Sequence, residues 1–355
     1  MRRREFITLV GGAATAWPLA AQAQQPKNIP RLCFLTFDPG TLRTTRFEAF
    51  FRALADLGYA DGQTISIDYL SAEGRGERFP ALAAECLRLN ADIIAVSTTP
   101  ATQAAKKVTR TIPIVMIALG DPVGTGLVDS LAQPGGNVTG MSMMVPELAT
   151  KRLQLLKEAV PAISRVLVLS YLVDPIAPLQ VKALQQAAPS LGVTLQIQDI
   201  RTADDLPAAF EAGARERAEG LLTTAESIFV AQRARVSELA VRYRLPAMYP
   251  YSIQVTDAGG LLAYDVNYPD LERRAAAYVD KILKGAKPSN LPVQQPTKFA
   301  LVINLKTAKT LGLTISESFL LAPTSSSNNG LFAAVHESGS GTFRTSQDVR
   351  LESAK

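Results

Sequence analysis

Short apolar runs alternate with longer amphipathic stretches along residues 31–313, and this alternation limits the possible fold more than any other feature. The runs at 31–37, 92–98 and 112–119 are apolar without strict alternation, as in strands that are buried on both faces. The stretches between them carry apolar residues on one helical face. Strand–helix–strand units of this kind pair in parallel with right-handed crossovers. The sequence therefore predicts an α/β fold built from doubly wound parallel sheets.

The same rhythm continues to the end of this region and divides it into two units. Further strands are expected at 64–70, 137–143, 165–171, 193–200, 220–225, 246–251, 259–266 and 293–305. Helices are expected at 44–59, 77–90, 99–109, 145–161, 178–192, 204–218, 229–244, 269–285 and 306–313. A chain of 355 residues is too long for one small core, so we expect two lobes. In such folds the ligand lies beyond the carboxyl ends of the strands, here in a cleft between the lobes.

A glycine-rich stretch at 120–140 follows the apolar run at 112–119. It holds six glycines and two prolines, which is typical of a backbone that approaches another group closely. It lacks the third glycine of a dinucleotide loop and the lysine of a phosphate loop, so we expect no nucleotide there. Asp121 at its start could pair with a ligand ammonium or could simply form an Asp-Pro turn.

The first 23 residues are typical of an export signal. They have a basic start, an apolar stretch from 7 to 21 and the small-x-small sequence Ala21-Gln22-Ala23. Arg3-Arg4-Glu5-Phe6-Ile7 matches the twin-arginine pattern. The apolar stretch is shorter than the roughly 20 residues that span a membrane, and no later stretch reaches that length. We therefore expect a Tat-like signal peptide cleaved after Ala23, a periplasmic protein and no transmembrane segment in the mature chain.

Charge, histidine and cysteine content exclude several classes of function. The formal net charge is +5, with no basic stripe interleaved with aromatic residues, so we expect no nucleic-acid partner. The single histidine, His336, lies in a polar tail, which excludes His/Cys metal clusters and His-dependent triads from the folded body. Cys33 and Cys86 fall in a strand and a helix. The pattern favours two buried unpaired thiols, with a disulfide as the alternative in an oxidising compartment.

The stretch Ser97–Gln103 is the main candidate binding segment of the first unit. Thr98 or Thr99 before Pro100 is a typical helix N-cap, and the exposed N–H groups there suit a carboxylate or another anion. The alternative is an ordinary capped helix. In the second unit, rim positions after the strands can contact a ligand or close the edge of a core. The rim residues considered are Thr224, Glu226, Tyr249, Tyr251, Tyr264 and Asp265, with Asp38 and Asp121 from the first unit. Together the two rims fit a zwitterionic amino acid.

The candidate residues do not form a catalytic set. General acid–base or nucleophilic catalysis needs paired groups or an activated nucleophile, and no G-x-S-x-G motif occurs. A two-lobed racemase would need one thiol in each lobe, whereas Cys33 and Cys86 both lie in the first unit. We therefore expect a protein that is not an enzyme, with no cofactor and no metal.

Three stretches resemble one family of exported proteins. The segments at 120–140, 258–288 and 301–313 are similar to those of periplasmic substrate-binding proteins of ABC importers, in the family that includes tryptophan- and tyrosine-binding members. The resemblance covers roughly 30–320. It implies a type I periplasmic binding protein fold, in which two doubly wound parallel-sheet lobes are joined by three crossings around a ligand cleft.

The resemblance also implies a domain map and a binding site. The first lobe would comprise 29–138 plus about 268–290, and the second 139–266 plus about 293–320. The implied pocket residues are Thr98, Thr99, Thr102, Gln103 and Asp121 of the first lobe, with the loop after 220–225 and Asp265 of the second. Thr224-Ala225-Glu226 stands where many relatives carry a Pro-Asp pair. Residues 322–355 are rich in Ser, Thr, Gly and Asn, and we expect a disordered tail there.

These observations predict a monomer that captures a small polar ligand, such as an amino acid, and delivers it to an inner-membrane ABC permease. Two alternatives stay open. One is a sensory module that presents its ligand to a membrane receptor. The other is a periplasmic two-lobed enzyme such as an amino-acid racemase.

Overall fold

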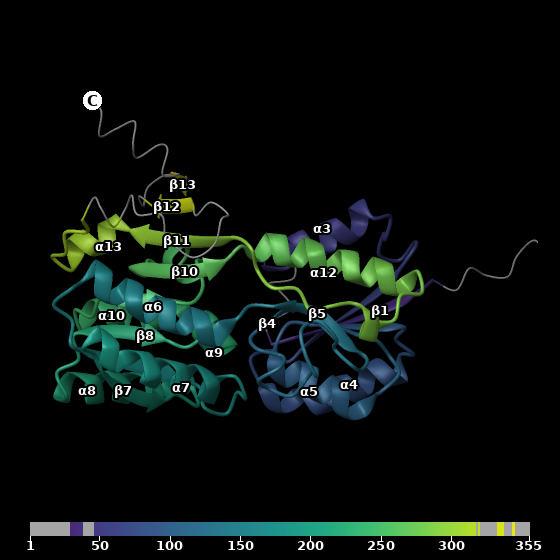
Figure 1. Cartoon of the computed structure of the whole chain (residues 1–355), viewed down its shortest axis with the longest axis horizontal. Coiled ribbons are helices and arrows are strands. Elements are labelled where there is room, and N and C mark those ends of the chain that lie inside the picture. Colours follow the sequence, from purple (N-terminus) through teal and green to yellow (C-terminus); the bar gives the residue numbers. More distant parts are fainter. Residues whose placement is uncertain (1–28, 38–45, 317–318, 320–331, 337–342, 345–355) are drawn as a thin grey trace, which may run out of the picture.

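Two parallel sheets lie side by side in the computed structural model, which describes residues 29–37, 46–316, 319, 332–336 and 343–344 (Figure 1). The expected leader at 1–23 and Asp38 lie outside the described residues. The predicted α/β fold with two lobes is confirmed. Within the described part of the chain, no helix is both long and apolar enough to cross a membrane.

The first sheet has five parallel strands in the order β2-β1-β3-β4-β5. Its strands are β1 (Arg31–Thr36), β2 (Ser66–Ser71), β3 (Ile93–Val96), β4 (Ile114–Leu119) and β5 (Val138–Ser142). The helices α3 (Glu48–Asp56) and α12 (Tyr268–Leu283) cover one face, and α4 (Phe79–Arg88) and α5 (Thr99–Val108) cover the other (Figure 1). Leu32 and Phe34 pack on the α3 side, while Cys33 and Leu35 pack on the α4 side, as the twofold periodicity of a strand requires.

The second sheet has eight strands in the order β13-β12-β11-β10-β9-β8-β6-β7. Its strands are β6 (Arg165–Ser170), β7 (Thr194–Asp199), β8 (Gly220–Thr223), β9 (Ala247–Tyr249), β10 (Leu262–Val266), β11 (Phe299–Asn304), β12 (Phe332–His336) and β13 (Phe343–Arg344). Strands β6 to β10 are parallel, and β11 joins β10 in antiparallel orientation. The associated helices are α6 (Val145–Ala159), α7 (Ala177–Ala187), α8 (Leu206–Arg215), α9 (Ser227–Ala231), α10 (Arg233–Arg242), α11 (Ile253–Thr256) and α13 (Leu305–Thr310).

The chain crosses between the two sheets three times. It leaves the first sheet after β5, returns after β10 to form α12 against α3, and leaves again before β11 (Figure 1). The crossings are hydrogen-bonded to one another. Ser142 N donates to Gln294 O at 2.8 Å, and Asn267 N donates to Lys298 O at 3.0 Å. Because β5 pairs with β4 through Ser142, the first crossing follows Ser142, whereas the sequence placed the boundary between 138 and 139.

The C-terminal segment differs from the expectation in one respect. We expected no regular structure beyond 322, but residues 332–336 form β12, which pairs in parallel with β11. The sequence Phe332-Ala-Ala-Val-His336 is a short, mainly apolar run, and β11 would otherwise be an open sheet edge. A paired strand therefore replaces the expected disorder at these residues.

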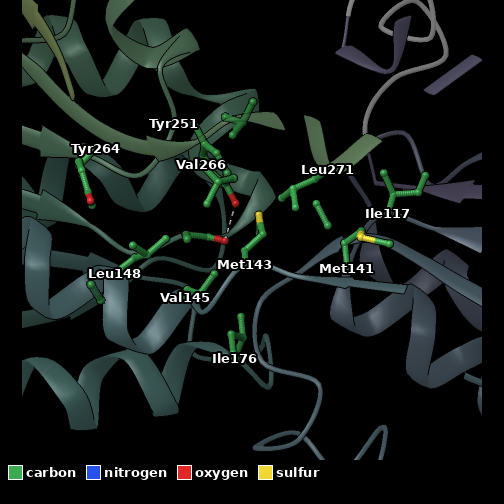
Figure 2. Close-up of a cluster of buried hydrophobic side chains, with 14 of the residues drawn as sticks. Ile117, Met141, Met143, Val145, Leu148, Ile176, Tyr251, Tyr264, Val266 and Leu271 are labelled. Carbon is green, nitrogen blue, oxygen red and sulfur yellow. Dashed lines mark hydrogen bonds between the residues drawn. The ribbon is translucent and has the colours of Figure 1, made fainter. Parts of the chain in front are cut away.

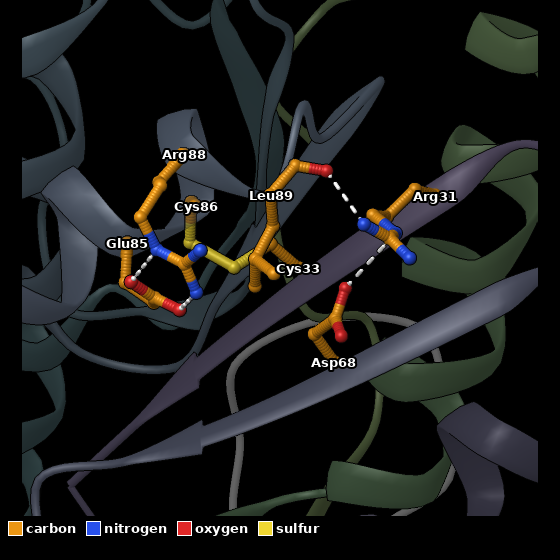
Figure 3. The surroundings of a disulfide bond; sticks show 7 residues. All are labelled: Arg31, Cys33, Asp68, Glu85, Cys86, Arg88 and Leu89. Atoms are coloured by element: carbon orange, nitrogen blue, oxygen red, sulfur yellow. Dashed lines mark hydrogen bonds and ion pairs between the residues drawn. A yellow bond between two sulfur atoms is a disulfide. The ribbon is translucent and has the colours of Figure 1, made fainter.

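The two cysteines form a disulfide, so the expectation of two unpaired thiols is wrong (Figure 3). Both side chains are fully buried. Cys33 lies on the face of β1 that α4 covers, and Cys86 lies on the face of α4 that packs on β1. Their Cα atoms are 5.8 Å apart, within the usual range for a disulfide. Packing of the helix on the strand brings the thiols together, and the position of each residue in its own element gives no sign of it.

One apolar cluster extends through both lobes. Figure 2 shows Ile117 and Met141 of the first sheet in the same cluster as Leu148 of α6 and Tyr264 of β10. Met143 and Val145, on the first crossing, link the two groups. Burial of apolar area across the crossings stabilises them, since each buried methylene contributes about 0.8 kcal/mol. The lobes are thus joined on the crossing side by a shared core.

We predict that the Cys33→Ala/Cys86→Ala variant loses about 2–4 kcal/mol of unfolding free energy, because the disulfide closes a long loop in the unfolded chain. The bridged residues are 53 positions apart in the sequence. Urea unfolding of the oxidised protein, the reduced protein and the variant measures the loss. Reduced wild type should match the variant, and equal stability of all three would contradict the prediction.

Candidate functional site

Loops at the carboxyl ends of both sheets meet in a narrow space between the lobes, here called the central gap. Its walls come from the loops after β3, β4, β6, β8, β9 and β10 and from Arg46. Its lining residues are Arg46, Ser97, Thr98, Thr99, Ala118, Leu119, Gly120, Met143, Asp174, Ile176, Ala225, Ser227, Tyr251 and Tyr268. The gap measures about 20 Å³, room for about one water molecule.

Two larger cavities adjoin the central gap and share residues with it. The α3 cavity, of about 620 Å³, shares Arg46, Tyr251 and Tyr268 with the gap and runs along α3. The α5 cavity, of about 360 Å³, shares Thr98, Asp174 and Ser227 with it. Both volumes lie in the range of small-molecule sites. The lining of the α5 cavity includes the aromatic side chains of Phe37, Phe79 and Tyr171.

The first-lobe wall is built around the start of α5. Thr98 is the N-cap, in extended conformation, and its Oγ1 accepts a hydrogen bond from Ala101 N at 3.3 Å. Pro100 lies in the first turn, where its missing N–H costs no helix hydrogen bond. The sequence thus begins the helix at the end of β3. Because Pro100 has no N–H and Ala101 N is bonded to Thr98, the helix dipole and the N–H of Thr99 are the groups at this end that favour a bound anion.

Gly120 lies where this wall meets the second lobe. A Cβ atom at Gly120 would come within 2.6 Å of Ile176 Cγ1 and 2.9 Å of its Cδ1. Its φ is not in the left-handed region, so the requirement for glycine here is spatial. The group that this glycine-rich backbone approaches closely is therefore a side chain of the opposite lobe.

Asp174 contributes a carboxylate to the second-lobe wall. It follows β6, is 8% exposed, and lines both the central gap and the α5 cavity. Its Oδ1 accepts a hydrogen bond from Ile176 N at 3.1 Å. Burial raises the pKa of Asp174 to about 6, with the Ile176 hydrogen bond acting in the opposite direction. The Asp174 carboxylate is thus ionised at neutral pH, but its buried charge costs free energy unless a cation pairs with it.

Arg46 provides positive charge from the first lobe. Its guanidinium lies 5.9 Å from the ring centroid of Tyr251 and 5.6 Å from that of Phe47. Such contacts hold the guanidinium against the aromatic faces. Because Arg46 and Asp174 both line the gap, it carries one charge of each sign.

Glu226 lies behind the second-lobe wall in a buried hydrogen-bond network. It accepts from Gln180 Nε2 at 2.6 Å, from Tyr171 N at 3.4 Å and from the Thr224 hydroxyl. Gln180 Oε1 accepts from Ala225 N at 2.9 Å. Burial, reinforced by the nearby charge of Asp174, raises the pKa of Glu226 to about 8. The network fixes the loop that brings Ala225 and Ser227 to the gap.

The structure brings four of the predicted site residues to the cavities, and Tyr251 from the wider set of rim residues lines both the central gap and the α3 cavity. Thr98 and Thr99 line the central gap, Gln103 lines the α5 cavity, and Asp265 lines the α3 cavity. Burial raises the pKa of Asp265 to about 6, and its Oδ2 accepts from Ser252 N at 2.9 Å.

The other described predictions lie away from these three cavities. Thr102 is fully buried and donates to Thr98 O at 2.8 Å. Asp121 Oδ1 accepts from the N–H groups of residues 123 and 124, as in an Asp-Pro turn. Thr224 and Glu226 belong to the network behind the wall, and Tyr249 is fully buried in the core of the second lobe.

Three charged or aromatic residues of the gap, Asp174, Arg46 and Tyr268, were absent from the predicted site. Asp174 comes after the end of β6, a strand end that was not considered in the sequence analysis. Its position after a strand could therefore have identified it as a candidate site residue. Arg46 lies close to the start of α3, and Tyr268 is the first residue of α12. Within the described residues, no group of three or more His, Cys, Asp or Glu side chains is placed to hold a metal ion.

Comparison with known proteins assigns most of the chain to one family. Residues 40–327 match the family described as ABC transporter substrate binding protein. A tyrosine-binding protein of Clostridioides difficile is 28% identical over 266 residues, which cover 75% of this chain and 76% of that protein.

Two solved structures are similar to this chain in fold. A Streptococcus pneumoniae ABC domain in complex with L-Trp has a TM-score of 0.75 and 25% identity, covering 82% of this chain and 97% of that one. The ligand-free, open structure of a substrate-binding protein with adhesive properties from Clostridium difficile has a TM-score of 0.61 and 26% identity, covering 81% and 97%.

A family match over more than half of the chain, on a two-lobed fold with a gap at the strand ends, determines the assignment. The protein belongs to the substrate-binding proteins of ABC transporters, and it is a solute-binding component and not an enzyme.

Proposed function

We propose that this protein captures an amino acid in the central gap, in the periplasm, and delivers it to an inner-membrane ABC permease. The observation that carries the proposal is the placement of opposite charges on the two walls of the gap. Arg46 and the start of α5 lie on the first lobe, and Asp174 lies on the second. A zwitterion satisfies both sides with one molecule.

The two ends of the zwitterion have distinct partners. The carboxylate would accept hydrogen bonds at the N-terminus of α5, near Thr98 and Thr99, with Arg46 as its counter-charge. The ammonium would pair with Asp174 and so remove the cost of keeping this carboxylate ionised while buried. One ligand can contact the partners of its carboxylate and of its ammonium together only when the lobes are close. Ligand binding therefore favours the closed state.

An aromatic amino acid fits the surroundings of the gap best. The α5 cavity opens from Thr98 and Asp174 and holds Phe37, Phe79 and Tyr171. Its volume of about 360 Å³ accommodates a ring, and aromatic walls favour stacked or edge-to-face contacts. The relatives named for tyrosine and bound to L-Trp support the same class.

The arrangement of the lobes supports capture by closure. The central gap of about 20 Å³ has room for about one water molecule, so the charged end of an amino acid would reach Thr98 and Asp174 only when the lobes move apart, with its side chain in the adjoining α5 cavity of about 360 Å³. The chain is more similar to the L-Trp complex, with a TM-score of 0.75, than to the open, ligand-free structure, with 0.61, and this supports a closed arrangement of its lobes. Hinge closure about the three crossings would be the functional motion.

Location in the periplasm rests on two features. The leader has the pattern of a Tat-like signal, and the Cys33–Cys86 disulfide is typical of an oxidising compartment. In this setting the captured solute would pass to a permease.

The proposal predicts that aromatic amino acids stabilise the mature chain. A ligand present at 100 times its Kd adds about 2.7 kcal/mol to the unfolding free energy. A thermal-shift screen of the twenty amino acids, with sugars and purines as controls, should give its largest shifts with tryptophan, tyrosine or phenylalanine. Stabilisation by a sugar or purine and by no amino acid would refute the proposal.

We predict that ligand affinity falls as the pH drops below about 6. Asp174 has a raised pKa, so in the free protein it is ionised above pH 6 and becomes protonated, and unable to pair with an ammonium, below it. Calorimetry from pH 5 to 8 should show this loss of affinity at low pH, here called the acid limb. Its limiting slope should be about a tenfold loss of affinity per pH unit. Asp174→Asn should remove the limb and weaken binding at pH 7.5 by about tenfold or more.

Asp265→Asn is the matched control, since burial also raises the pKa of Asp265 to about 6. Glu226 titrates higher, near pH 8. Loss of the acid limb in the Asp265 variant, with the limb kept in Asp174→Asn, would place the ammonium in the α3 cavity instead.

We predict that Gly120→Ala weakens ligand binding about tenfold or more while the ligand-free protein stays folded, because the added methyl group meets Ile176 only when the lobes are together. In the Ile176→Ala background the same substitution should have little effect on Kd. Gly136→Ala is the control, since no atom lies within 4 Å of its added Cβ and its φ is not left-handed. Equal losses of affinity in both backgrounds would contradict this account of closure.

A further inference from the structure

The pairing of β9 with β10 stops just before the residues that line the cavities. Met248 pairs with Leu262, and Tyr249 pairs with Ala263. The next pair in this register would be Pro250 with Tyr264. This pair needs a hydrogen bond from Tyr251 N to Tyr264 O, because Leu221 N donates to Pro246 O and the backbone of β9 alternates, so that Pro250 faces β8 and Tyr251 faces β10. Tyr251 N donates instead to Gln254 Oε1 at 3.2 Å, and the ladder ends there.

Arg152 of α6 occupies the place of the missing pair. Its Nε donates to Tyr264 O at 2.8 Å, and its Nη2 donates to Pro250 O at 3.3 Å. The two acceptors are the residues that would have formed the next rung. A planar guanidinium suits this task, since its donors diverge in a fixed fork.

Beyond Arg152, side chains continue to bridge the two strand ends. Asp265 Oδ2 accepts from Ser252 N at 2.9 Å. Between these two bridges lies Tyr251, which lines both the central gap and the α3 cavity. Its hydroxyl donates to Ala225 O at 2.9 Å, so it also holds the loop after β8. The position of Tyr251 therefore depends on how the ends of β9 and β10 are held apart.

The energetics of Arg152 argue against a role in stability alone. The residue is 2% exposed, and its Nη1 has no hydrogen-bond partner within the described residues. No ion pair to a described carboxylate balances its charge, although Asp265 lies near enough to favour the charged form. A buried, incompletely satisfied cation costs free energy, and a well-packed apolar residue is often no worse.

We propose that Arg152 is a positioning residue for ligand binding. Its guanidinium bonds the Tyr264 oxygen that Tyr251 N leaves unused, and thereby sets Tyr251 at the wall of the central gap. Arg152 does not line the three cavities and acts through Tyr251. The assignment rests on the proposed function, because it takes the central gap as the ligand site.

The test compares ligand affinity with stability in Arg152→Lys and Arg152→Gln, neither of which can donate to both carbonyls through a planar fork. Calorimetry with the amino acid that stabilises wild type most should give a Kd at least tenfold higher in both variants. Arg31→Lys is the control, since Arg31 also donates from its guanidinium to a backbone carbonyl, that of Leu89 at 2.7 Å, in the first lobe. Its Kd should stay within twofold of wild type.

A double-variant cycle separates positioning from a general structural effect. If Arg152 acts through Tyr251, then Arg152→Lys/Tyr251→Leu binds no more than twofold weaker than Tyr251→Leu alone. Additive losses, an unchanged Kd in folded Arg152 variants, or failure of both Arg152 variants to fold would each overturn the assignment. Absence of any amino-acid binding by wild type would instead refute the proposed function.

Discussion

The hydrogen bonds between the three crossings are the constraint on which the rest of the structure depends. They join Ser142 to Gln294 and Asn267 to Lys298, and they bring the carboxyl ends of two parallel sheets to one shared space. Each wall of the central gap is then a set of strand-end loops that no single lobe could complete. The charges that face the gap, from Arg46 and Asp174, meet only because the crossings place the lobes opposite each other.

The glycine-rich loop after β4 shows how this constraint shapes the sequence. Its backbone approaches the opposite lobe, where Ile176 leaves no room for a side chain at Gly120. The same principle explains the residues behind the walls. Gln180, Glu226 and Arg152 do not line the three cavities described above, but their hydrogen bonds hold loops that do. The shape of the gap thus depends on buried polar groups as well as on the residues that line it.

The fold could be predicted from the sequence because strand and helix periodicities are local. The same reasoning found Thr98 and Thr99, since an N-cap before proline at a strand end is a local signal. It failed where tertiary packing determines which side chains reach the candidate site. Tyr249 and Tyr251 are two residues apart on one segment, yet Tyr249 is in the last pair of the β9–β10 ladder, whereas Tyr251 lies past its end and donates its N–H to Gln254. The disulfide, the seating of Asp121 in its own turn and the approach of Arg46 to Tyr251 likewise depend on tertiary contacts.

The central claim is that the two lobes close on a solute about the crossings. Small-angle X-ray scattering of the mature chain, with and without the amino acid that stabilises it most, measures this most directly. The account predicts a smaller radius of gyration and a scattering curve that approaches the one calculated from the closed structure when ligand is added. An identical curve in both states, at ligand concentrations well above Kd, would contradict it.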